Sequence, residues 1–307
     1  MRILFMGTPE FAVPSLRILL DHSYDISGVV TAPDKPRGRG QQMSFTLIKE
    51  FALHHHLTIL QPEDLKDSKF ISDVQQLAPD LMVVVAFRVL PREVYTIPKL
   101  GSFNLHASLL PKYRGAAPIN WAIINGEKES GVTTFFLQDK VDTGSILLQA
   151  RVNIGMDETA GELHDELSAV GAKVVLQTVQ LIEFGKAQPR LQNDSLACPA
   201  PKIFKSDCHI DWKKSSQQVH DFIRGLSPHP ASWTMHNGKT IKMYRTKIVE
   251  AQSKEAGIVL QRTNDTLLVG TGNGAVSILE IQQEGKRRLG IEEFLRGYTI
   301  EAGELFE

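Results

Sequence analysis

The stretch DLMVVVA, residues 80–86, is hydrophobic at every position after its first. A strand exposed on one face alternates polar and apolar residues, whereas a strand covered by helices on both faces can be apolar throughout. We therefore expect residues 80–86 to form a central strand of a sheet with helices on both sides.

Short apolar runs on both sides of this stretch alternate with segments of helical spacing. The runs are RILFM (2–6), ISGVVT (26–31), SFNLH (102–106) and VTTFFL (132–137), and the helical segments include PEFAVPSLRILL (9–20) and FTLIKEFALHHH (45–56). Such alternation is typical of βαβ units, whose strands are parallel. The pattern predicts an α/β fold with a doubly wound, mostly parallel sheet.

The end of this pattern is marked by a helix and a segment without periodicity. Thr159 and Glu162 have the spacing of a capping box, and Gly185 supplies a stop. The segment that follows is rich in Pro, Ser and Lys, and we expect residues 189–205 to be a linker between domains.

Beyond the linker, one helix over 214–225 precedes several short strands separated by turn signals such as HNGK. This spacing predicts a small β-barrel, OB-like in type. The expected organisation is therefore an α/β catalytic domain over 1–188, a basic linker over 189–205 and a C-terminal barrel over 206–307.

Composition excludes several classes of protein. Of the 307 residues, 42% are hydrophobic. The 34 Lys and Arg nearly balance the 35 Asp and Glu, so the net charge does not indicate a nucleic acid or a membrane as partner. No apolar run approaches about 18 residues. Cys198 and Cys208 are too few for a disulfide framework and favour a reducing compartment. We expect a cytoplasmic monomer that makes no membrane contact.

A polar pair interrupts the apolar strand at 102–106. Successive strand side chains point to opposite faces, so Asn104 and His106 share a face that Phe103 and Leu105 do not. Ligands of open α/β sheets bind beyond the carboxyl ends of the strands. Asn104 and His106 lie at the carboxyl end of this strand. The alternative is that both are edge residues satisfied by backbone groups.

Two carboxylates follow the next strand, in the segment QDKVDTGSILLQ (138–149). Asp139 and Asp142 precede a glycine that permits a sharp turn, and either can serve simply as a turn former. An amide, an imidazole and a carboxylate from neighbouring strand ends are also a set suited to acyl transfer through a tetrahedral oxyanion.

Two other functional readings are weak. The consecutive histidines at 54–56 point in different directions on a helix, so they do not make a metal site by themselves. FMGTPEF (5–11) occupies the position of a dinucleotide-binding loop but has a single glycine, which disfavours a nicotinamide cofactor. We expect no metal.

Motifs along essentially the whole chain carry a family resemblance: FMGTPEFAVPSL, NLHASLLPKYRGAAPINWAI, VDTG, APKI, IDW, IRGLSPHP and QQEGKRRL. Together they resemble the methionyl-tRNA formyltransferase family. The block at 104–123 resembles the wider superfamily of formyltransferases that use 10-formyltetrahydrofolate.

The resemblance implies roles for particular residues. It places Asn104, His106 and Asp142 on the catalytic triad, and it places a stretch of four residues on the folate contact: Ser108, Leu109, Leu110 and Pro111. The implied reaction is transfer of a formyl group from 10-formyltetrahydrofolate to the α-amine of initiator methionyl-tRNA. In that chemistry Asn104 and a protonated His106 stabilise the charge on the formyl oxygen, and Asp142 orients the imidazole and helps to relay the proton.

Basic residues supply the expected RNA contacts. APDKPRGRGQQ (32–42) carries Lys35, Arg37 and Arg39, and Arg39 aligns with the arginine that the family inserts into the acceptor arm of tRNA. Residues 186–247 hold 11 Lys or Arg against 4 Asp or Glu, with Lys202 in the APKI motif. Guanidinium and ammonium groups suit phosphate contacts. The alternative is a set of solvated basic surfaces.

One departure from the family stands after the central strand. Phe87 and Arg88 replace an aromatic-glycine pair, so a side chain either reshapes the wall of the folate pocket or brings a charge toward the folate.

Two other functions fit parts of the pattern. A formyltransferase acting on an amino sugar nucleotide shares the triad and the SLLP stretch but not the Arg-rich loop or the basic linker. A nucleic-acid-binding protein with an inactive enzyme fold is disfavoured by the intact set of Asn104, His106 and Asp142.

Overall fold

The computed structural model describes residues 1–37, 42–251 and 255–307. These residues form two compact units that interleave in sequence. Unit 1 contains 1–115, 131–152 and 164–199, and unit 2 contains 116–130, 153–163 and 200–307.

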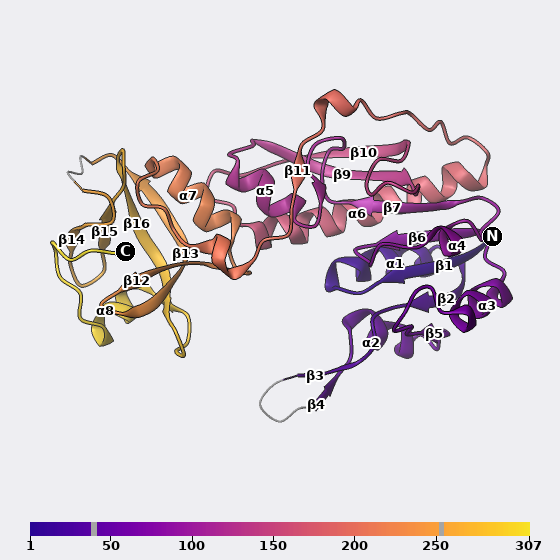
Figure 1. The fold of residues 1–307 in the computed structure, drawn as a ribbon, viewed down its shortest axis with the longest axis horizontal. Coiled ribbons are helices and arrows are strands. Elements are labelled where there is room, and N and C mark those ends of the chain that lie inside the picture. Colours follow the sequence, from indigo (N-terminus) through magenta and orange to yellow (C-terminus); the bar gives the residue numbers. More distant parts are fainter. Residues whose placement is uncertain (38–41, 252–254) are drawn as a thin grey trace. The chain divides into compact units, whose positions relative to one another are not determined.

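The described residues of unit 1 are built on a mixed sheet with the order β10-β9-β7-β6-β1-β2-β5 (Figure 1). Its strands are β1 (Arg2–Gly7), β2 (Asp25–Val30), β5 (Ile59–Leu60), β6 (Leu81–Val85), β7 (Ser102–His106), β9 (Glu129–Phe136) and β10 (Ile146–Asn153). The strands from β7 to β5 pair in parallel, and β9 runs antiparallel to β7. The predicted α/β class is confirmed.

The expected central strand is β6, which lies between β1 and β7 with all five of its residues buried. Helices of this unit and its borders are α1 (Val13–Asp21), α2 (Leu47–His54), α3 (Ser68–Leu77), α4 (Arg92–Tyr95) and α6 (Ala160–Glu183), with the 3-10 turns η1 (Glu10–Ala12) and η2 (Asp194–Leu196). Neither α3 nor β10 was predicted from the sequence pattern. Only Phe70 and Val74 are buried on α3, which leaves a short apolar signal.

The antiparallel sheet of unit 2 has the order β12-β13-β16-β15-β14, with β17 paired to β16. The strands are β12 (Ser232–His236), β13 (Lys239–Val249), β14 (Val259–Arg262), β15 (Leu267–Gly270), β16 (Ala275–Gln283) and β17 (Leu289–Gly290), and the helices are α5 (Pro118–Ile124), α7 (Ser216–Gly225) and α8 (Ile291–Gly297), with the turn η3 (Lys205–Cys208). The hairpin predicted at HNGK is confirmed: Asn237 and Gly238 have φ of 49° and 71°, as a two-residue turn of this kind needs.

The two edge strands of this sheet, β12 and β14, do not pair with each other in the described residues. The C-terminal segment instead hydrogen-bonds to both sides. Glu307 exchanges backbone hydrogen bonds with Met235 of β12, and Val259 of β14 donates to the carbonyl of Glu304. A core that includes Trp212, Ile278 and Phe306 fills the space inside.

No helix in the described part of the chain combines the length and the apolar character needed to span a bilayer.

The capping box predicted at Thr159 and Glu162 is confirmed. Glu162 Oε2 accepts from the Thr159 backbone N–H at 2.8 Å, and Thr159 Oγ1 accepts from the Glu162 N–H at 3.3 Å. Glu162 Oε1 also accepts from Arg245 of β13 at 2.5 Å. Burial raises the pKa of Glu162, but the hydrogen bonds from Arg245 and Thr159 outweigh burial and lower the pKa to about 2.

These contacts predict how stability depends on pH. The pKa of Glu162 is lower in the folded chain than in the unfolded chain, where it is about 4.3. The carboxylate therefore stabilises the fold at pH values above the unfolded pKa. This stabilisation is lost as the pH falls through the pKa of the folded chain. We expect Glu162→Gln to lower the free energy of unfolding by about 0.5–1 kcal/mol at pH 7, a range that allows for its half-exposed side chain.

The measurement is denaturant unfolding of both proteins between pH 7 and pH 3, with the exposed Glu166→Gln as the control. We expect the difference in the free energy of unfolding between wild type and Glu162→Gln to become smaller below about pH 4.5. A difference that stays constant over the whole range would show that the charge of Glu162 is not what stabilises this contact.

Candidate functional site

The polar pair predicted on one strand lies at the carboxyl end of β7. Phe103 and Leu105 are buried on the opposite face, where Gly171 allows α6 to pack closely: a Cβ on Gly171 would lie 2.7 Å from Leu105 Cδ2. Asn104 and His106 therefore face away from α6. Asn104 is half-buried, and none of the hydrogen bonds among the described residues uses its side-chain amide.

His106 is held between a carbonyl and a carboxylate. Its side chain is 7% exposed, Nε2 lies 2.8 Å from the carbonyl oxygen of Tyr113, and Nδ1 lies 3.9 Å from Asp142 Oδ2. A carbonyl oxygen only accepts, so Nε2 carries a proton. Nδ1 is then the ring atom that gains or gives a proton, and it does so facing Asp142.

Asp142 sits in a turn with unusual backbone geometry. Its φ is 56°, a region that non-glycine residues rarely occupy. The side chain is 11% exposed, and Oδ2 accepts a hydrogen bond from the backbone N–H of Gly115 at 2.9 Å. The carboxylate is thus fixed by a bond to the loop after β7 while it faces the imidazole of His106.

The glycine that follows is required by a close approach. A Cβ on Gly144 would lie 1.6 Å from the carbonyl oxygen of Phe136, at the end of β9. Only a residue without a side chain lets the turn fold back against that strand.

The structure separates the two carboxylates that sequence analysis offered. Asp139 accepts from Tyr95 Oη at 2.5 Å and from Arg92 Nη1 at 2.9 Å, and its side chain is 67% exposed. The hydrogen bond from Tyr95, with help from Arg92, lowers the pKa of Asp139. Asp139 therefore belongs to a surface cluster, and Asp142 is the carboxylate beside His106.

The stretch expected to contact folate forms the loop directly after His106. Ser108 is fully buried and donates from its hydroxyl to the carbonyl of Lys112 at 2.7 Å, so this hydroxyl is used inside the loop. Leu110 is also buried, whereas Leu109 and Pro111 are half-exposed. The loop can therefore offer Leu109 and Pro111 to a ligand more readily than the Ser108 hydroxyl.

Two residues that sequence analysis missed brace this loop. Thr133 of β9 donates to the carbonyl of Ser108 at 2.6 Å and accepts from the backbone N–H of Leu110 at 3.1 Å. Gln149 of β10 donates to the carbonyl of Leu110 at 2.9 Å and to Thr133 Oγ1 at 2.9 Å. Both residues bind backbone groups of a distant segment, a relation that no local sequence pattern reveals.

Arg88 is held against a neighbouring segment. Its guanidinium donates to the carbonyls of Pro62 at 2.6 Å and Glu63 at 2.9 Å, and it lies 5.4 Å from the centre of the Phe87 ring.

The basic residues expected to contact RNA are described only in part. Lys35 is exposed and begins β3 (Lys35–Arg37), which pairs with β4 (Gln42–Ser44). The Arg37 side chain and the whole of Arg39 lie outside the described residues. Asp34, the acid of this loop, pairs with Lys49, and that hydrogen bond lowers the pKa of Asp34.

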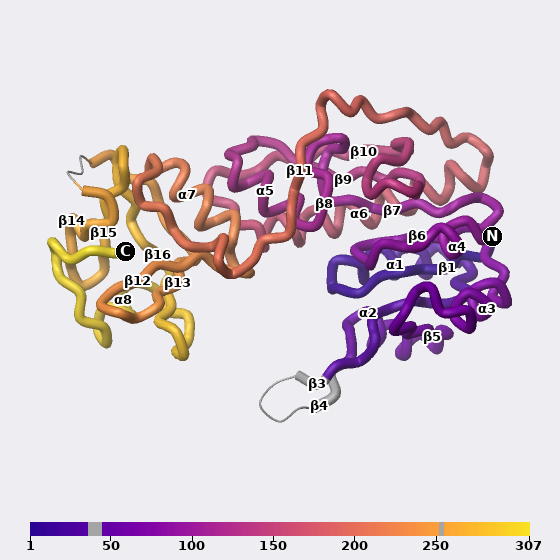
Figure 2. The backbone as a smooth tube through the Cα atoms, in the orientation of Figure 1, coloured from indigo at the N-terminus to yellow at the C-terminus, as the bar shows by residue number. Residues whose placement is uncertain are grey.

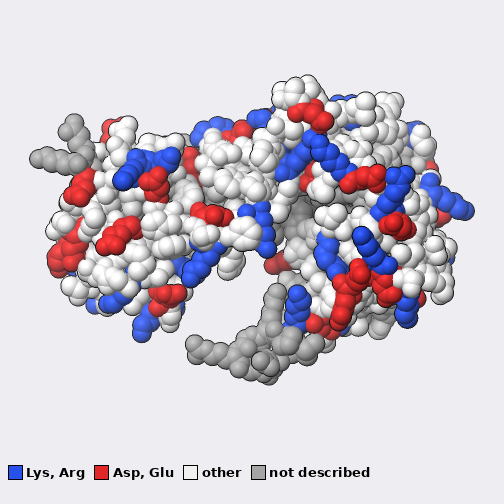
Figure 3. All heavy atoms as spheres, in the orientation of Figure 1, with Lys and Arg blue, Asp and Glu red and all other residues white. Residues whose placement is uncertain are grey.

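Lys202 belongs to unit 2 and is exposed. Its Nζ lies 5.3 Å from the centre of the Phe204 ring, which is itself 57% exposed. On the face drawn in Figure 3, Lys and Arg side chains are interspersed with Asp and Glu.

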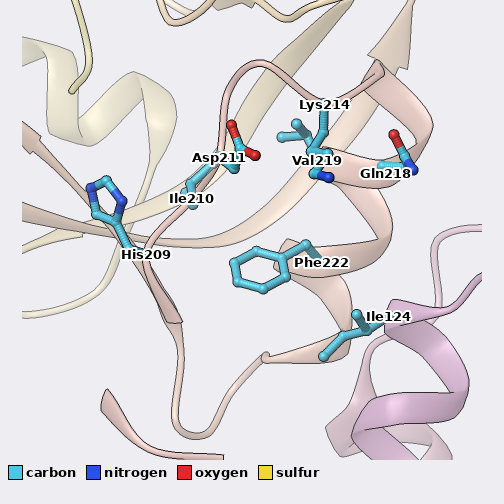
Figure 4. Close-up of a pocket in the computed structure, with 8 residues that line it drawn as sticks. All are labelled: Ile124, His209, Ile210, Asp211, Lys214, Gln218, Val219 and Phe222. Carbon is cyan, nitrogen blue, oxygen red and sulfur yellow. The ribbon is translucent and has the colours of Figure 1, made fainter. Parts of the chain in front are cut away.

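Unit 2 also contains a pocket of about 210 Å³ (Figure 4). Ile124, Ile210, Val219 and Phe222 contribute apolar lining, with the Asp211 side chain among the polar groups around it. None of the residues predicted to form a site lines this pocket.

Among the described residues, no group of three or more His, Cys, Asp or Glu is placed to hold a metal ion. Cys198 and Cys208, both described, are free thiols.

Comparison with known families identifies the family of this chain. Residues 1–179 match the formyl transferase family, and residues 202–299 match the formyl transferase C-terminal domain. The chain therefore belongs to the formyl transferase family.

Within that family, the chain groups with the methionyl-tRNA formyltransferases. It is 47% identical over 309 residues to the methionyl-tRNA formyltransferase of Caldanaerobacter subterraneus subsp. tengcongensis, with 100% of both chains covered. It is also 47% identical to that of Flavobacterium johnsoniae, covering 98% of this chain and 97% of the relative.

A solved structure shares the fold at lower identity. WlaRD, described as a sugar 3N-formyl transferase in the presence of dTDP and 5-N-formyl-THF, superposes with a TM-score of 0.68 at 22% identity. The match covers 94% of this chain and 99% of that one.

Proposed function

We propose that this chain transfers the formyl group of 10-formyltetrahydrofolate to the α-amine of initiator methionyl-tRNA. The single observation that carries the proposal is the arrangement at the end of β7, where buried His106 faces Asp142 at 3.9 Å. Asn104 stands two residues away with its amide uncommitted. The full-length identity to methionyl-tRNA formyltransferases supports the choice of substrate.

The proposed reaction needs no nucleophile from the protein. The neutral α-amine attacks the formyl carbon, a carbon–nitrogen bond forms, and negative charge develops on the formyl oxygen. The bond from that carbon to N10 of the folate then breaks, and the proton lost by the amine reaches N10. The protein has to stabilise the oxyanion and to move this proton.

The contacts of each side chain suggest its task. Asn104 has an amide free to donate to the oxyanion, and removal of one such donor typically costs about 10² to 10³ in rate. His106 Nε2 is occupied by the Tyr113 carbonyl, so the imidazolium donates from Nδ1. Asp142 faces Nδ1 and stabilises the charged ring when it carries the proton.

The co-substrate site is proposed to lie along Ser108 to Pro111. The hydrogen bonds from buried Thr133 and from exposed Gln149 hold this loop in one shape before a ligand arrives, which lowers the ordering cost of binding. No metal takes part in the proposed reaction.

The contacts with tRNA are proposed for Lys35, Arg37, Arg39 and Lys202. We assign catalysis to residues 1–188 and tRNA binding to 206–307, with 189–205 as the basic segment that links them, although residues up to 199 belong to unit 1. The sheet of this last part is proposed to close as an OB-like barrel, because the C-terminal segment hydrogen-bonds to both β12 and β14. The protein is further proposed to act as a cytoplasmic monomer.

A formyltransferase that acts on an amino sugar nucleotide is the nearest rival, because its fold superposes on this chain. The direct experiment supplies the purified chain with 10-formyltetrahydrofolate and, side by side, initiator methionyl-tRNA or a dTDP-linked amino sugar. We expect a preference for the tRNA of at least about 10⁴ in kcat/KM, because a site built for one acceptor leaves polar groups unpaired with the other. Equal or greater turnover of the sugar would refute the proposal.

The two carboxylates give a matched pair for testing the catalytic assignment. We expect Asp142→Asn to lower kcat/KM for formyl transfer by about 10² to 10³, because it removes the charge facing His106 Nδ1. Asp139→Asn, which changes an exposed carboxylate of the same segment, should stay within about twofold of wild type. Initial rates measure both, with thermal unfolding as a check on folding. Equal losses in the two variants would remove Asp142 from the mechanism.

The proposed role of Arg39 is tested on substrate affinity. We expect Arg39→Ala to raise KM for methionyl-tRNA about tenfold, the loss of one good contact, and to reduce the salt dependence of tRNA binding by about one charge. Calorimetric affinity for a folate analogue should not change. Arg92→Ala, an exposed arginine of α4, is the control. A parallel loss of folate affinity would contradict the assignment.

A further inference from the structure

The segment 190–198, which we call the strap, lies within the region that sequence analysis predicted to be a linker. In the structure it belongs to unit 1, includes the 3-10 turn η2, and is part of the chain that returns from α6 past β10 (Figure 2). Its first residue, Arg190, exchanges two backbone hydrogen bonds with Ile146, at 2.7 and 2.9 Å. The strap therefore adds to the edge of the sheet where β10 begins.

Gln192 of the strap contacts the turn that carries Asp142. Its amide nitrogen donates to the carbonyl of Asp142 at 2.9 Å and to the carbonyl of Gly144 at 2.8 Å. These two acceptors stand on either side of Thr143. One side chain thus fixes both ends of the tightest part of the turn.

The other end of the Gln192 amide is fixed as well. Its oxygen accepts from Arg114 Nε at 3.1 Å and from Arg114 Nη2 at 2.7 Å, and the same guanidinium donates to Asp194 at 2.7 Å. The Arg114 side chain is only 14% exposed. Arg114 directly precedes Gly115, whose N–H holds the Asp142 carboxylate.

The strap also contacts the residue that binds the imidazole. The backbone N–H of Tyr113 donates to Cys198 Sγ at 3.2 Å, and the N–H of Arg114 donates to the carbonyl of Cys198 at 3.0 Å. The carbonyl of Tyr113 is the group bound to His106 Nε2. Both partners of His106 are therefore braced by the same segment.

We infer that Gln192 is a positioning residue that holds the Asp142 carboxylate in place facing His106, an inference that rests on the proposed function. Asp142 has φ of 56°, a conformation that persists only where the surroundings impose it. Among the described residues, Gln192 is the side chain that binds the Asp142 carbonyl. Without it, two carbonyls of the turn lose their partner, and the turn is free to relax to a less strained backbone with the carboxylate displaced from Nδ1.

The contacts of Gln192 predict whether its substitution changes kcat or KM. Gln192 contacts the turn and not the loop proposed for folate, so substrate affinity should change little. A displacement of about 1 Å of a catalytic group can cost on the order of 10²-fold in rate. We expect Gln192→Ala to lower kcat for methionyl-tRNA formylation by about 10- to 100-fold and to leave both KM values within about threefold.

The matched control is the next residue of the strap. Asn193 is exposed, and within the described part of the chain its side-chain oxygen accepts only from the N–H and hydroxyl of Ser195. Asn193→Ala should retain wild-type kcat. Equal loss in both variants would mean that any disturbance of the strap lowers the rate, and the assignment to Gln192 would fail.

Gln192→Glu separates the two halves of the contact. A carboxylate still accepts from Arg114 but cannot donate to the carbonyls of Asp142 and Gly144. This variant should therefore lose kcat as Gln192→Ala does, even where Arg114 keeps the strap in place and thermal unfolding is unchanged. Wild-type kcat in Gln192→Glu would overturn the inference.

A double-mutant cycle distinguishes positioning from general stabilisation. If Gln192 acts through Asp142, then Gln192→Ala added to Asp142→Asn lowers kcat by no more than about twofold further, measured in single turnovers at high enzyme concentration. A full additional 10- to 100-fold loss would show that Gln192 acts by another route. Failure of the wild-type chain to formylate methionyl-tRNA would instead refute the proposed function itself, so the two failures are told apart.

Discussion

The interaction on which this site depends is the hydrogen bond between His106 Nε2 and the carbonyl of Tyr113. It assigns a proton to Nε2 and leaves Nδ1 toward Asp142. This hydrogen bond also requires the chain to fold back, so that Tyr113, seven residues after His106, lies beside the imidazole. The loop from Ala107 to Arg114 is therefore shaped by its hydrogen bond to His106, and the stretch proposed to contact folate is part of that loop.

A loop with this many buried polar groups is stable only if they are paired. An unpaired buried donor or acceptor costs about 1–3 kcal/mol, which is a large fraction of the stability of a domain. The buried side chains of Ser108 and Thr133, together with the exposed Gln149, pair with three carbonyls and one N–H group of the loop. The same bonds hold the loop in one shape, which suits the contact with folate that we propose for it.

The sequence predicted those parts of the molecule that depend on local pattern. Periodicity located the central strand β6 and the polar pair at Asn104 and His106, and capping chemistry located the start of α6. The order of the sheet, in which antiparallel β9 follows β7, is set by contacts between distant strands. Local pattern alone left Asp139 and Asp142 equivalent, because both fit a turn. The family resemblance selected Asp142, and in the structure burial and hydrogen-bond partners separate the two carboxylates.

The strap shows a limit of composition as a guide. The longer segment that contains it, residues 186–207, is rich in Pro, Ser and Lys and has no periodicity. This composition is typical of a linker, because such a segment buries little apolar surface. Residues 190–198 bury little, but they are fixed by polar bonds to backbone carbonyls and to one buried guanidinium. Every residue has a backbone carbonyl, so the sequence does not show which carbonyls accept these hydrogen bonds. A segment held in this way is therefore indistinguishable from a free linker until the turn it holds, here the one at Asp142, is seen beside it.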